Sequence, residues 1–449
     1  MNTTSELLEW VREKNKEIEV SIQRCSLSES EFWILDSKDG RLKTKNGSFF
    51  SIVGLEIREQ EEIISQQPVI LQDEIGYLGI ITKKINGVLH FLMQAKIEPG
   101  NVNHVQISPT IQATRSNFTQ LHGGREPLYL DYFLNATKHQ IIVDQIQSEQ
   151  SSRFFKKRNR NIIILVDEEI KCFDNFKWMT LGQIKELMQY DNLVNMDTRT
   201  VLSCIPYAEA DIECSQNEWR TQLIKKSPFA KSVLSVHNPI TEVWNAINDY
   251  KMFNYQKSRI IRLDQLYDWV LSDERFYCKK SYPYDIIFCN IKIDGREVEQ
   301  WTQPLIRATE KALFVLVQSE IAGEYKYLVK LCPEVGCFDS VELGPTLQRE
   351  ATEIDNQPNN KVESIVLEMI EKHCGIEYDV ILSEEGGRFY QEQNRNLVIK
   401  VKEEQVGELP KEYFWLSFGE LNRMVQYNNV LNIQLRNLLS LLEVPDEKN

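Results

Sequence analysis

The side chains best suited to chemistry gather in one polar stretch, residues 90–125. Its first part has the pattern of a β-strand whose alternate residues bring His90, Gln94 and Lys96 to one face. After a turn at Pro99-Gly100, a second extended stretch aligns further polar residues: Gln106, Ser108, Thr110, Gln112 and Thr114. Convergent amides and hydroxyls suit sugar hydroxyls and the edge of a pyrimidine. We therefore expect a ligand-binding face here, with a solvated sheet face as the plainer alternative.

Charged groups extend this face. Lys96 and Glu98 supply a cation and a carboxylate two residues apart, and Arg115 adds a second cation. Asn101 and Asn117 add amides. Lys96 and Glu98 could instead pair with each other, and Glu98 could simply be a turn residue before proline. The stretch has the residue types that a polar, charged small molecule requires.

The overall composition excludes several classes of protein. The 449 residues carry a formal charge of −14, which argues against a broad nucleic-acid surface but leaves room for a local basic pocket. No apolar run is long enough to span a bilayer or to form a signal peptide. Nine cysteines without a CxxC pair and six histidines without an HExxH motif predict free thiols and no metal site. We expect a cytoplasmic protein without membrane or nucleic-acid contacts.

The chain also repeats itself. Similar segments recur at offsets of 235 to 237: Ser108–Gln112 with Gly344–Gln348, Arg153–Asn161 with Arg388–Asn396, and Trp178–Gly182 with Trp415–Gly419. An earlier pair, 27–33 with 271–277, lies 244 apart, which predicts a deletion of about eight residues in the second copy. We infer two homologous domains. The first covers 1–235 with a leading helix, and the second covers 236–449 and opens with connector helices.

Both copies predict the same order of elements, which is a mixed α/β sheet fold rather than a parallel βαβ series. A first hairpin turns at Asn86-Gly87 and again at Gly323. Each copy then has a predicted helix, a second hairpin and a closing helix with a capping box at Thr180 or Ser417. The predicted middle helices are 129–148 and 361–373, and the second hairpins join 153–157 to 161–166 and 388–391 to 397–401.

Nearly the whole chain resembles the nucleotide-diphosphate-hexose 2,3-dehydratases. The segments that carry the resemblance are Gln72-Asp-Glu-Ile-Gly76, His90-Phe-Leu-Met-Gln-Ala-Lys96, Glu98-Pro-Gly-Asn101, Ser108-Pro-Thr110, Gln112-Ala-Thr-Arg-Ser-Asn117 and Trp301-Thr-Gln-Pro304. The resemblance implies a homodimer whose subunit holds two Nudix-like domains that arose by duplication. It also implies a substrate such as dTDP-4-keto-6-deoxyglucose, which loses its 2-hydroxyl as water to give a 3,4-diketo-2,6-dideoxy sugar.

That reaction needs a base for the C3 hydrogen, an acid for the leaving hydroxyl and donors for the enolate oxygen, without a metal or redox cofactor in principle. Glu98 is the first candidate for the base, and His122, whose imidazole titrates near neutral pH, is the second. Lys96 would protonate the leaving group or stabilise the enolate. Arg115 suits the diphosphate, because its guanidinium fork matches phosphate oxygens. The amides and hydroxyls of the polar face would hold the sugar and the base.

The second copy carries a related but altered set of residues. Its candidates for a second pocket are Arg275, Lys330, Glu334, Glu342 and Gln348. Ala351 stands where the first copy has Arg115, so we expect this pocket to bind a nucleotide sugar without being the main place for chemistry. Trp301 and Gln303 are expected to reach the first site across an interface, where Trp301 would stack on the base.

Two other functions stay open from sequence alone. One is a metal-dependent nucleotide-sugar pyrophosphatase, although Lys372 and His373 stand where a Nudix box needs paired glutamates to hold Mg²⁺. The other is a non-catalytic protein that binds nucleotide sugars. If the chain is a dehydratase, its unstable diketo product implies a 3-ketoreductase that acts next.

Overall fold

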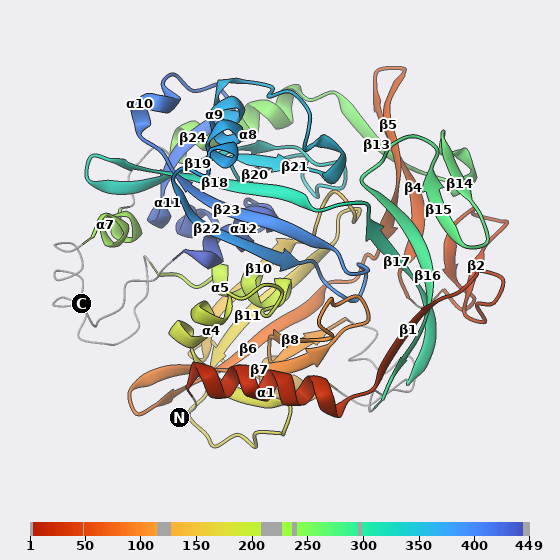
Figure 1. The fold of residues 1–449 in the computed structure, drawn as a ribbon, viewed down its shortest axis with the longest axis horizontal. Coiled ribbons are helices and arrows are strands. Elements are labelled where there is room, and N and C mark those ends of the chain that lie inside the picture. Colours follow the sequence, from red (N-terminus) through yellow and green to blue (C-terminus); the bar gives the residue numbers. More distant parts are fainter. Residues whose placement is uncertain are drawn as a thin grey trace.

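The computed structural model describes residues 3–47, 49–114, 127–207, 227–235, 240–294 and 299–442 (Figure 1). Within these ranges no helix has the length and apolar character needed to cross a bilayer. Every cysteine in them is a free thiol, as predicted.

The elements of the first copy are α1 (Thr4–Glu17), β1 (Val20–Arg24), β2 (Trp33–Leu35), β3 (Leu42–Thr44), β4 (Ser51–Glu59), β5 (Glu62–Leu71), β6 (Gly76–Ile85), β7 (Val88–Ile97), β8 (Val105–Ser108), β9 (Ile111–Ala113), α3 (Leu130–Leu134), β10 (Ile141–Ser148), β11 (Arg158–Leu165), β12 (Phe176–Thr180), α4 (Leu181–Leu187) and α5 (Met196–Ser203).

The elements that follow are α7 (Pro228–Leu234), α8 (Ile240–Phe253), β13 (Gln256–Ile261), the 3₁₀ helix η1 (Leu263–Gln265), β14 (Trp269–Leu271), β15 (Arg275–Cys278), β16 (Tyr284–Ile293), β17 (Gln300–Ala308), β18 (Ala312–Ile321), β19 (Glu324–Cys332), β20 (Glu342–Gly344), β21 (Leu347–Arg349), the 3₁₀ helix η2 (Ala351–Glu353), α9 (Lys361–Glu371), β22 (Ile376–Ser383), β23 (Gln393–Lys400), α10 (Glu403–Val406), β24 (Tyr413–Ser417), α11 (Phe418–Met424) and α12 (Ile433–Leu441).

Two large sheets repeat the same topology. One has the order β10-β11-β6-β7-β12, with β8 on β7 and β9 on β6. The other has the order β22-β23-β18-β19-β24, with β20 on β19 and β21 on β18. Only the pairs β6–β11 and β18–β23 are parallel among these strands. The predicted mixed α/β fold and the internal duplication are therefore confirmed.

Local sequence signals placed several elements correctly. The first hairpin turns at Asn86 and Gly87, both with positive φ (52° and 83°), and its counterpart turns at Ala322 and Gly323 (52° and 79°). Two positive φ values are the geometry that a two-residue hairpin needs. Helices α4 and α11 begin at Thr180 and Ser417, each with a complete capping box.

The predicted middle of each copy needs correction. Residues 129–148 are not one helix, because only α3 is helical and the β-branched run 141–148 forms strand β10. The predicted strand 153–157 is instead part of the loop from β10 to β11, with a single bridge from Phe154 to Ile70. Likewise 388–391 lies in the loop from β22 to β23, with a bridge from Phe389 to Ile306. These two loops carry much of the site described below.

The offset of 244 residues between 27–33 and 271–277 also needs correction. Trp33 begins β2 and Trp269 begins β14, so the equivalent strands lie 236 residues apart, like the rest of the chain. The similarity of 27–33 to 271–277 does not mark equivalent positions, and the deletion of about eight residues inferred from it is wrong. Helices α1 and α8 also lie 236 apart, so the helix interpreted as a connector is the second copy's equivalent of α1.

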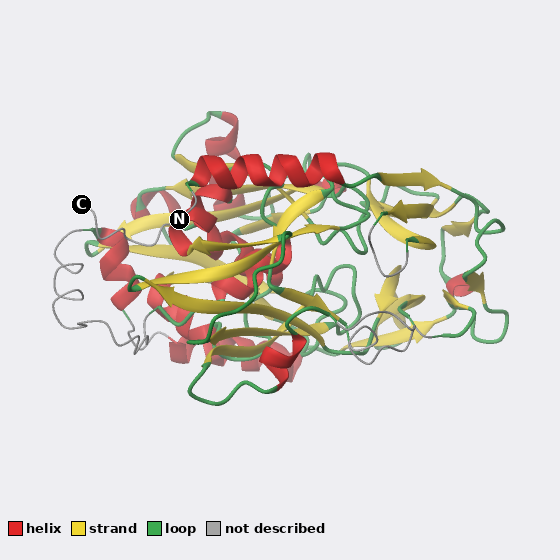
Figure 2. Cartoon of the chain, turned by 90° about the horizontal axis from the view of Figure 1, so that it is seen from below, coloured by secondary structure: helices red, strands yellow, loops and turns green. Residues whose placement is uncertain are grey.

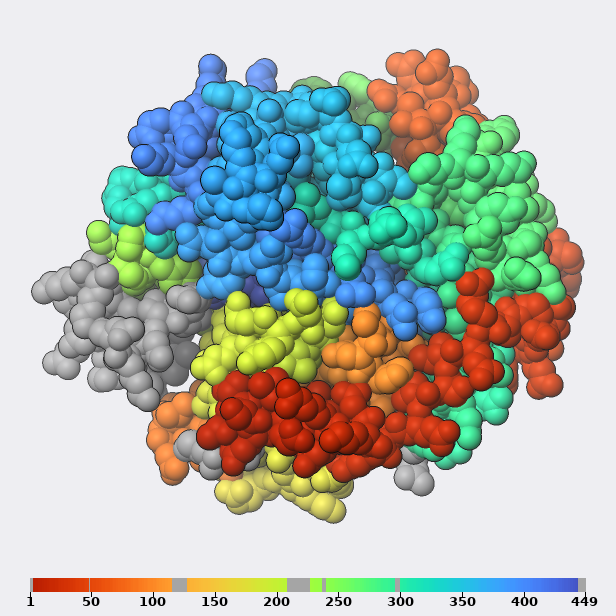
Figure 3. All heavy atoms as spheres, viewed as in Figure 1, coloured from red at the N-terminus to blue at the C-terminus, as the bar shows by residue number. Residues whose placement is uncertain are grey.

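The first strand of each copy pairs with a strand of the other copy. Strand β1 pairs antiparallel with β16, in a sheet of order β1-β16-β15-β14 with β17. Strand β13 pairs in the same way with β4, in a sheet of order β13-β4-β3-β2 with β5. The labelled strands of both smaller sheets lie at the right of Figure 1, and strands also gather at that end of the molecule in Figure 2. In the space-filling view the red N-terminal chain lies against green residues of the second copy (Figure 3). The two copies therefore cannot separate without breaking both of these sheets.

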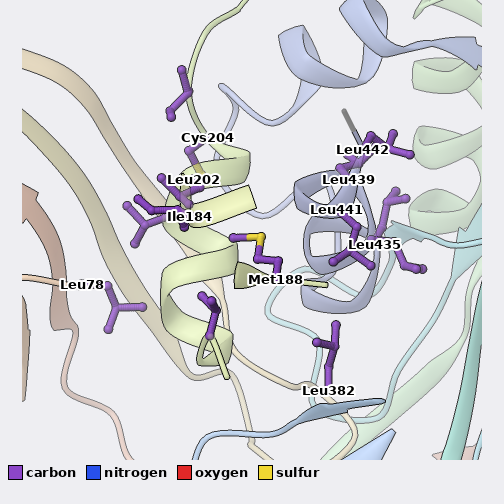
Figure 4. Close-up of a cluster of buried hydrophobic side chains, with 14 of the residues drawn as sticks. Leu78, Ile184, Met188, Leu202, Cys204, Leu382, Leu435, Leu439, Leu441 and Leu442 are labelled. Carbon is purple, nitrogen blue, oxygen red and sulfur yellow. The ribbon is translucent and has the colours of Figure 1, made fainter. Parts of the chain in front are cut away.

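The hydrophobic core between the large sheets fixes their relative position. Helices α5 and α12 pack against each other there, with Leu202 on the first and Leu435 and Leu439 on the second (Figure 4). All three side chains are buried. Burying a leucine stabilises a fold by about 1.5–3 kcal/mol, so a core of this extent holds loops of opposite copies in register.

Candidate active site

Glu98 is buried just after β7, and we call this carboxyl and the polar groups that contact it the first pocket. The Nζ atom of Lys96 is 3.2 Å from Glu98 Oε1. Gln112 Nε2 donates to the same oxygen at 2.8 Å, and the backbone N–H of Gly386 donates to Glu98 Oε2 at 3.2 Å. Three donors to one carboxyl favour its ionised form. The structure therefore brings Lys96, Glu98 and Gln112 together, and the ion pair raised as an alternative is present.

A second layer holds Gln112 in place. Asn195 Nδ2 donates to Gln112 Oε1 at 3.3 Å, and Asn195 is also the N-cap of α5 through Thr198 N. Both ends of the Gln112 amide are thus hydrogen-bonded. Its oxygen accepts from Asn195, the N-cap of α5, and its nitrogen donates to Glu98. The orientation of Gln112 is fixed by this arrangement.

The loop between β22 and β23, residues 384–392 of the second copy and called the closing loop, packs against Glu98 and Gly100. The N–H of Gly100 donates to Gly386 O at 2.6 Å, and Gln391 N donates to Gly100 O at 2.7 Å. The backbones approach so closely that a Cβ on Gly100 would lie 1.5 Å from Phe389 O. At Gly386 a Cβ would lie 2.8 Å from Glu98 Cβ. Both glycines are therefore required by contact rather than by an unusual backbone conformation.

Several buried or half-buried titratable groups in this region have shifted pKa values. Burial and the charge of Glu98 raise the pKa of Glu385, which lies in the closing loop, to about 8. Burial, with the charges of Glu149, Glu385 and Glu98, also raises the pKa of Asp197 well above its usual range. Burial lowers the pKa of Lys157 to about 8. Groups with perturbed pKa values in one pocket are typical of catalytic sites.

Arg388 adds a buried cation to the same loop. Its guanidinium carbon lies 4.3 Å from the ring centre of Phe50 and 4.8 Å from that of Phe49. It donates to Gly387 O at 2.8 Å and to Gln72 Oε1 at 3.3 Å. Within the part of the chain that the structure describes, no carboxylate lies within ion-pair distance of it. A buried guanidinium of this kind can receive an anionic group of a ligand.

Gln303 of β17 contacts the closing loop, and Trp301 contacts Gln303. The predicted stacking of Trp301 on the base of the ligand stays a prediction. Trp301 Nε1 donates to Gln303 Oε1 at 3.0 Å. Gln303 Nε2 in turn donates to Gly387 O. The two residues therefore support the loop that holds Arg388 and Gly386.

Other residues of the predicted polar face serve the fold. The hydroxyl of Thr110 accepts from Ile81 N at 2.9 Å and donates to Leu92 O, so it joins strands β6 and β7. Thr346 makes the same two bonds in the second copy, from Val317 N and to Leu328 O. We assign Thr110 a structural role in place of the predicted contact with the sugar.

The remaining residues of that face are spread over several environments. Gln106 is fully buried and donates to Ser383 Oγ of the second copy at 2.7 Å. Ser108 is buried and donates to Gln106 O at 3.5 Å. Asn101 donates to His104 O at 2.9 Å, while its buried Oδ1 has no hydrogen-bond partner among the described residues. Gln94 and Thr114 are partly buried. Arg115, Asn117 and His122 lie outside the described residues.

The second pocket repeats the first with changes. Gln348 Nε2 donates to Glu334 Oε1 at 3.1 Å, and Asn432 Nδ2 donates to Gln348 Oε1 at 3.0 Å. Burial raises the pKa of Glu334 to about 8. Glu342 is buried against Ser148 of the first copy, whose hydroxyl donates to Glu342 Oε2 at 2.8 Å. The structure therefore brings Glu334 and Gln348 together.

Two predicted members of the second pocket lie elsewhere. Lys330 points toward helix α9, where its Nζ atom is 3.6 Å from Glu363 Oε1. Arg275 lies on β15 of a smaller sheet and binds Asp285 at 3.3 Å. Neither contact involves Glu334. The sequence offset predicts the place of Lys330 on its strand correctly, but it does not predict that Glu363 of α9 lies next to its side chain.

Sequence reasoning missed Asn195, Asp197, Glu385 and Arg388. Asn195 and Asp197 begin a helix that lies far from the polar stretch in sequence. Arg388 belongs to a repeated segment that was recognised, but the segment was interpreted as a strand. A polar and glycine-rich run, Glu384-Glu-Gly-Gly-Arg388, was the available signal for a loop at a site.

The fold and the site together define an internally duplicated α/β protein with a cluster of buried carboxyl, amide and basic side chains. The sequence model of the NDP-hexose 2,3-dehydratases matches residues 4–205 and 240–442, which run from α1 to α5 and from α8 to α12. The chain belongs to this family. It is an enzyme that removes water from a nucleotide sugar.

Curated relatives agree over almost the full length. A protein of Saccharopolyspora spinosa named dTDP-4-dehydro-6-deoxy-alpha-D-glucopyranose 2,3-dehydratase is 35% identical, over 98% of this chain and 92% of its own. A protein of the same name from Amycolatopsis orientalis is 33% identical, over 98% of this chain and 90% of its own.

One solved structure, titled "Crystal structure of ADP compounds hydrolase", is 14% identical over 31% of this chain and 73% of its own, with a TM-score of 0.18. At that score the likeness carries no argument, and the Nudix-like fold stays a prediction.

Proposed function

We propose that the chain removes the 2-hydroxyl of dTDP-4-keto-6-deoxyglucose as water, in the pocket around Glu98, and so forms a 3,4-diketo-2,6-dideoxy sugar nucleotide. The names of the relatives support this substrate. The observation that carries the proposal is the buried Glu98 carboxyl with its three donors, beside a buried arginine. Such a pocket offers a base and an anion-binding group side by side.

In this proposal Glu98 takes the C3 hydrogen, which the C4 ketone acidifies. The ammonium group of Lys96, 3.2 Å from Glu98, stabilises the charge that develops on the enolate. Arg388 holds the diphosphate, together with Arg115. Asn101 offers its unpartnered buried Oδ1 to a sugar hydroxyl.

The proposal extends to the surroundings of the enzyme. We propose two units, 1–235 and 236–449, in a homodimer that works in the cytoplasm. The exchanged strands β1 and β13 would tie the two units of one subunit together. A vicinal diketone is reactive, so a 3-ketoreductase is the expected next enzyme.

The test is mass spectrometry of dTDP-4-keto-6-deoxyglucose incubated with the purified protein and EDTA, with a 3-ketoreductase and NADPH to trap the product. Loss of one water and gain of two hydrogens would support the proposal. Unchanged substrate combined with tight binding of dTDP would contradict it and indicate another sugar or a binding protein. Cleavage of the diphosphate only after Mg²⁺ is restored would identify a pyrophosphatase.

A further inference from the structure

The leaving hydroxyl needs a proton, and Lys96 is engaged in an ion pair with Glu98. We propose that Glu385, contributed by the second copy of the fold, is the catalytic acid that protonates the departing 2-hydroxyl. This inference rests on the function proposed above, and it makes the active site a product of both copies.

The position of Glu385 is fixed by the backbone on either side of it. The next residue, Gly386, donates its N–H to Glu98 Oε2 at 3.2 Å and accepts from Gly100 N at 2.6 Å. Gly387 N donates to Glu385 Oε1 at 2.9 Å, which orients the carboxyl and leaves Oε2 to carry the proton. Glu385 remains partly exposed although its neighbours are buried, as a group that meets a substrate must be.

A second observation indicates where the ligand lies. Asn101 is 2% exposed, and its buried Oδ1 atom has no hydrogen-bond partner among the described residues. A Cβ on Gly386 would come within 2.2 Å of this oxygen, so Asn101 and the closing loop are in direct contact. A buried acceptor without a donor is costly unless a ligand satisfies it. A sugar hydroxyl at Asn101 would lie beside both Glu98 and the loop that carries Glu385.

The two carboxyl groups stand in different surroundings. Glu98 lies beside the Lys96 ammonium and accepts from Gln112 Nε2 and Gly386 N. Burial, the charge of Glu98 and that of Glu149 raise the pKa of Glu385 to about 8, against the opposing charges of Arg388 and Lys96. Asp197 also faces this group, since the charge of Glu385 acts on it. A carboxyl group that keeps its proton near neutral pH is the kind of group that general-acid catalysis needs.

The other pocket lacks this pair. Its loop makes equivalent contacts, with Gly336 N donating to Ser151 O at 2.9 Å and Phe154 N to Gln150 O at 2.9 Å, where the first pocket has Phe389 N donating to Glu385 O at 3.2 Å. Gln150 therefore occupies the place of Glu385, and an amide cannot donate a proton as an acid does. Cys332 likewise occupies the place of Lys96, because each pairs with the equivalent residue of the next strand.

The step balances without a cofactor. The Glu98 carboxylate takes the C3 proton, and the electron pair of that bond forms the enolate of the C4 ketone. Collapse of the enolate forms the C2–C3 double bond and breaks the C2–O bond, while the Glu385 proton passes to the oxygen that leaves as water. Loss of the C3 hydroxyl proton and gain of a proton at C2 then give the diketone and return both carboxyls to their starting states.

The experiment compares two substrates that differ in their need for an acid. The first is dTDP-4-keto-6-deoxyglucose, and the second is its 2-deoxy-2-fluoro analogue, whose fluoride leaves without protonation. Glu385→Gln should lower turnover of the first by about 10²–10³-fold. Its rate of fluoride release from the second, read with a fluoride electrode, should stay within about threefold of the wild type. Glu98→Gln should abolish both reactions, and unchanged dTDP binding by each variant serves as the folding control.

Further readouts separate an acid from a structural residue. Glu385→Asp should recover part of the lost turnover, and wild-type turnover should fall as the pH rises through about 8, where Glu385 loses its proton. Loss of fluoride release in Glu385→Gln, or full retention of water loss, would overturn the assignment. If the wild-type protein removes neither water nor fluoride, the proposed function itself fails, which is a different result.

Discussion

The two pockets have the same framework and different chemistry. In both, a glutamate accepts from a glutamine that an N-cap asparagine holds: Glu98, Gln112 and Asn195 in the first, and Glu334, Gln348 and Asn432 in the second. The charges around that framework differ. The first pocket has Lys96 and Glu385 where the second has Cys332 and Gln150. A duplicated fold has thus kept the hydrogen bonds of this framework and changed the charged groups around it.

The arginines differ in the same way. Arg153 binds Glu350 through both terminal nitrogens, at 3.0 and 2.7 Å, and lies 4.3 Å from the centre of the Tyr284 ring. Arg388 stacks similarly on Phe50, but Thr114 stands where Glu350 would be. The second pocket satisfies its arginine internally. In the first, no carboxylate of the described residues lies at ion-pair distance from Arg388, although the charges of Glu385 and Glu98 act on it.

The largest expected effect separates the two glutamates. Glu98→Gln should lower turnover by at least about 10³-fold, since removal of a general base typically costs 10²–10⁴-fold. Glu334→Gln should change turnover by less than about threefold. The trapped-product assay measures both, and binding of dTDP to each variant controls for folding. Equal losses in the two variants would show that both pockets take part in the chemistry.

The second prediction compares two arginines, of which one is expected to affect dTDP binding and the other the stability of the fold. Arg388→Gln should weaken dTDP binding by about 10- to 100-fold, because a charge-assisted contact is worth roughly 1.5–3 kcal/mol. Arg153→Gln should leave that affinity nearly unchanged but destabilise the fold by about 3 kcal/mol, since Glu350 and the buried Glu392 lose their cation. Calorimetric titration and urea unfolding measure the two effects. Loss of dTDP affinity in the Arg153 variant alone would reverse the assignment.

The sequence predicts the features that depend on residues close together along the chain. The turn at Asn86-Gly87, the capping boxes and the grouping of Lys96 with Glu98 all follow from local rules, and the structure confirms them. Contacts between copies could not be predicted in this way. The N–H of Gly386 reaches Glu98 across 288 positions of sequence, from a loop in which residues 388–391 had been predicted to form a strand.

The same limit explains the misplaced side chains. Alternation put Thr110 on a polar face, but the face it shares is the seam between β6 and β7, where backbone groups use its hydroxyl. Lys330 was assigned by its offset from Gln94, yet helix α9, with Glu363, covers that side of the second sheet. Periodicity and offset predict where a residue lies on its strand. The neighbours that pack over its side chain determine which contacts it makes.

The smallest expected effect concerns a position where the copies differ by one atom type. Glu342 accepts from Ser148 Oγ at 2.8 Å, and its counterpart Gln106 donates to Ser383 Oγ at 2.7 Å. Burial raises the pKa of Glu342 to about 7 from an ordinary value of 4.5. The folded state therefore holds a proton that the unfolded chain releases, so the stability from this group is complete below about pH 4.5 and is lost as the pH rises through 7.

Glu342→Gln gives the second copy the residue type that the first copy has at this position. It also removes the titratable carboxyl group. Urea unfolding at pH 5 and pH 8 should show that the variant loses less stability than the wild type between the two, by roughly 1–3 kcal/mol. Comparing the two proteins at the same pH values cancels the other buried carboxyls, Glu334 and Glu392 among them. An identical loss in both proteins would mean that Glu342 is ionised in the folded state, and that Arg436, whose charge acts on it, compensates for its burial.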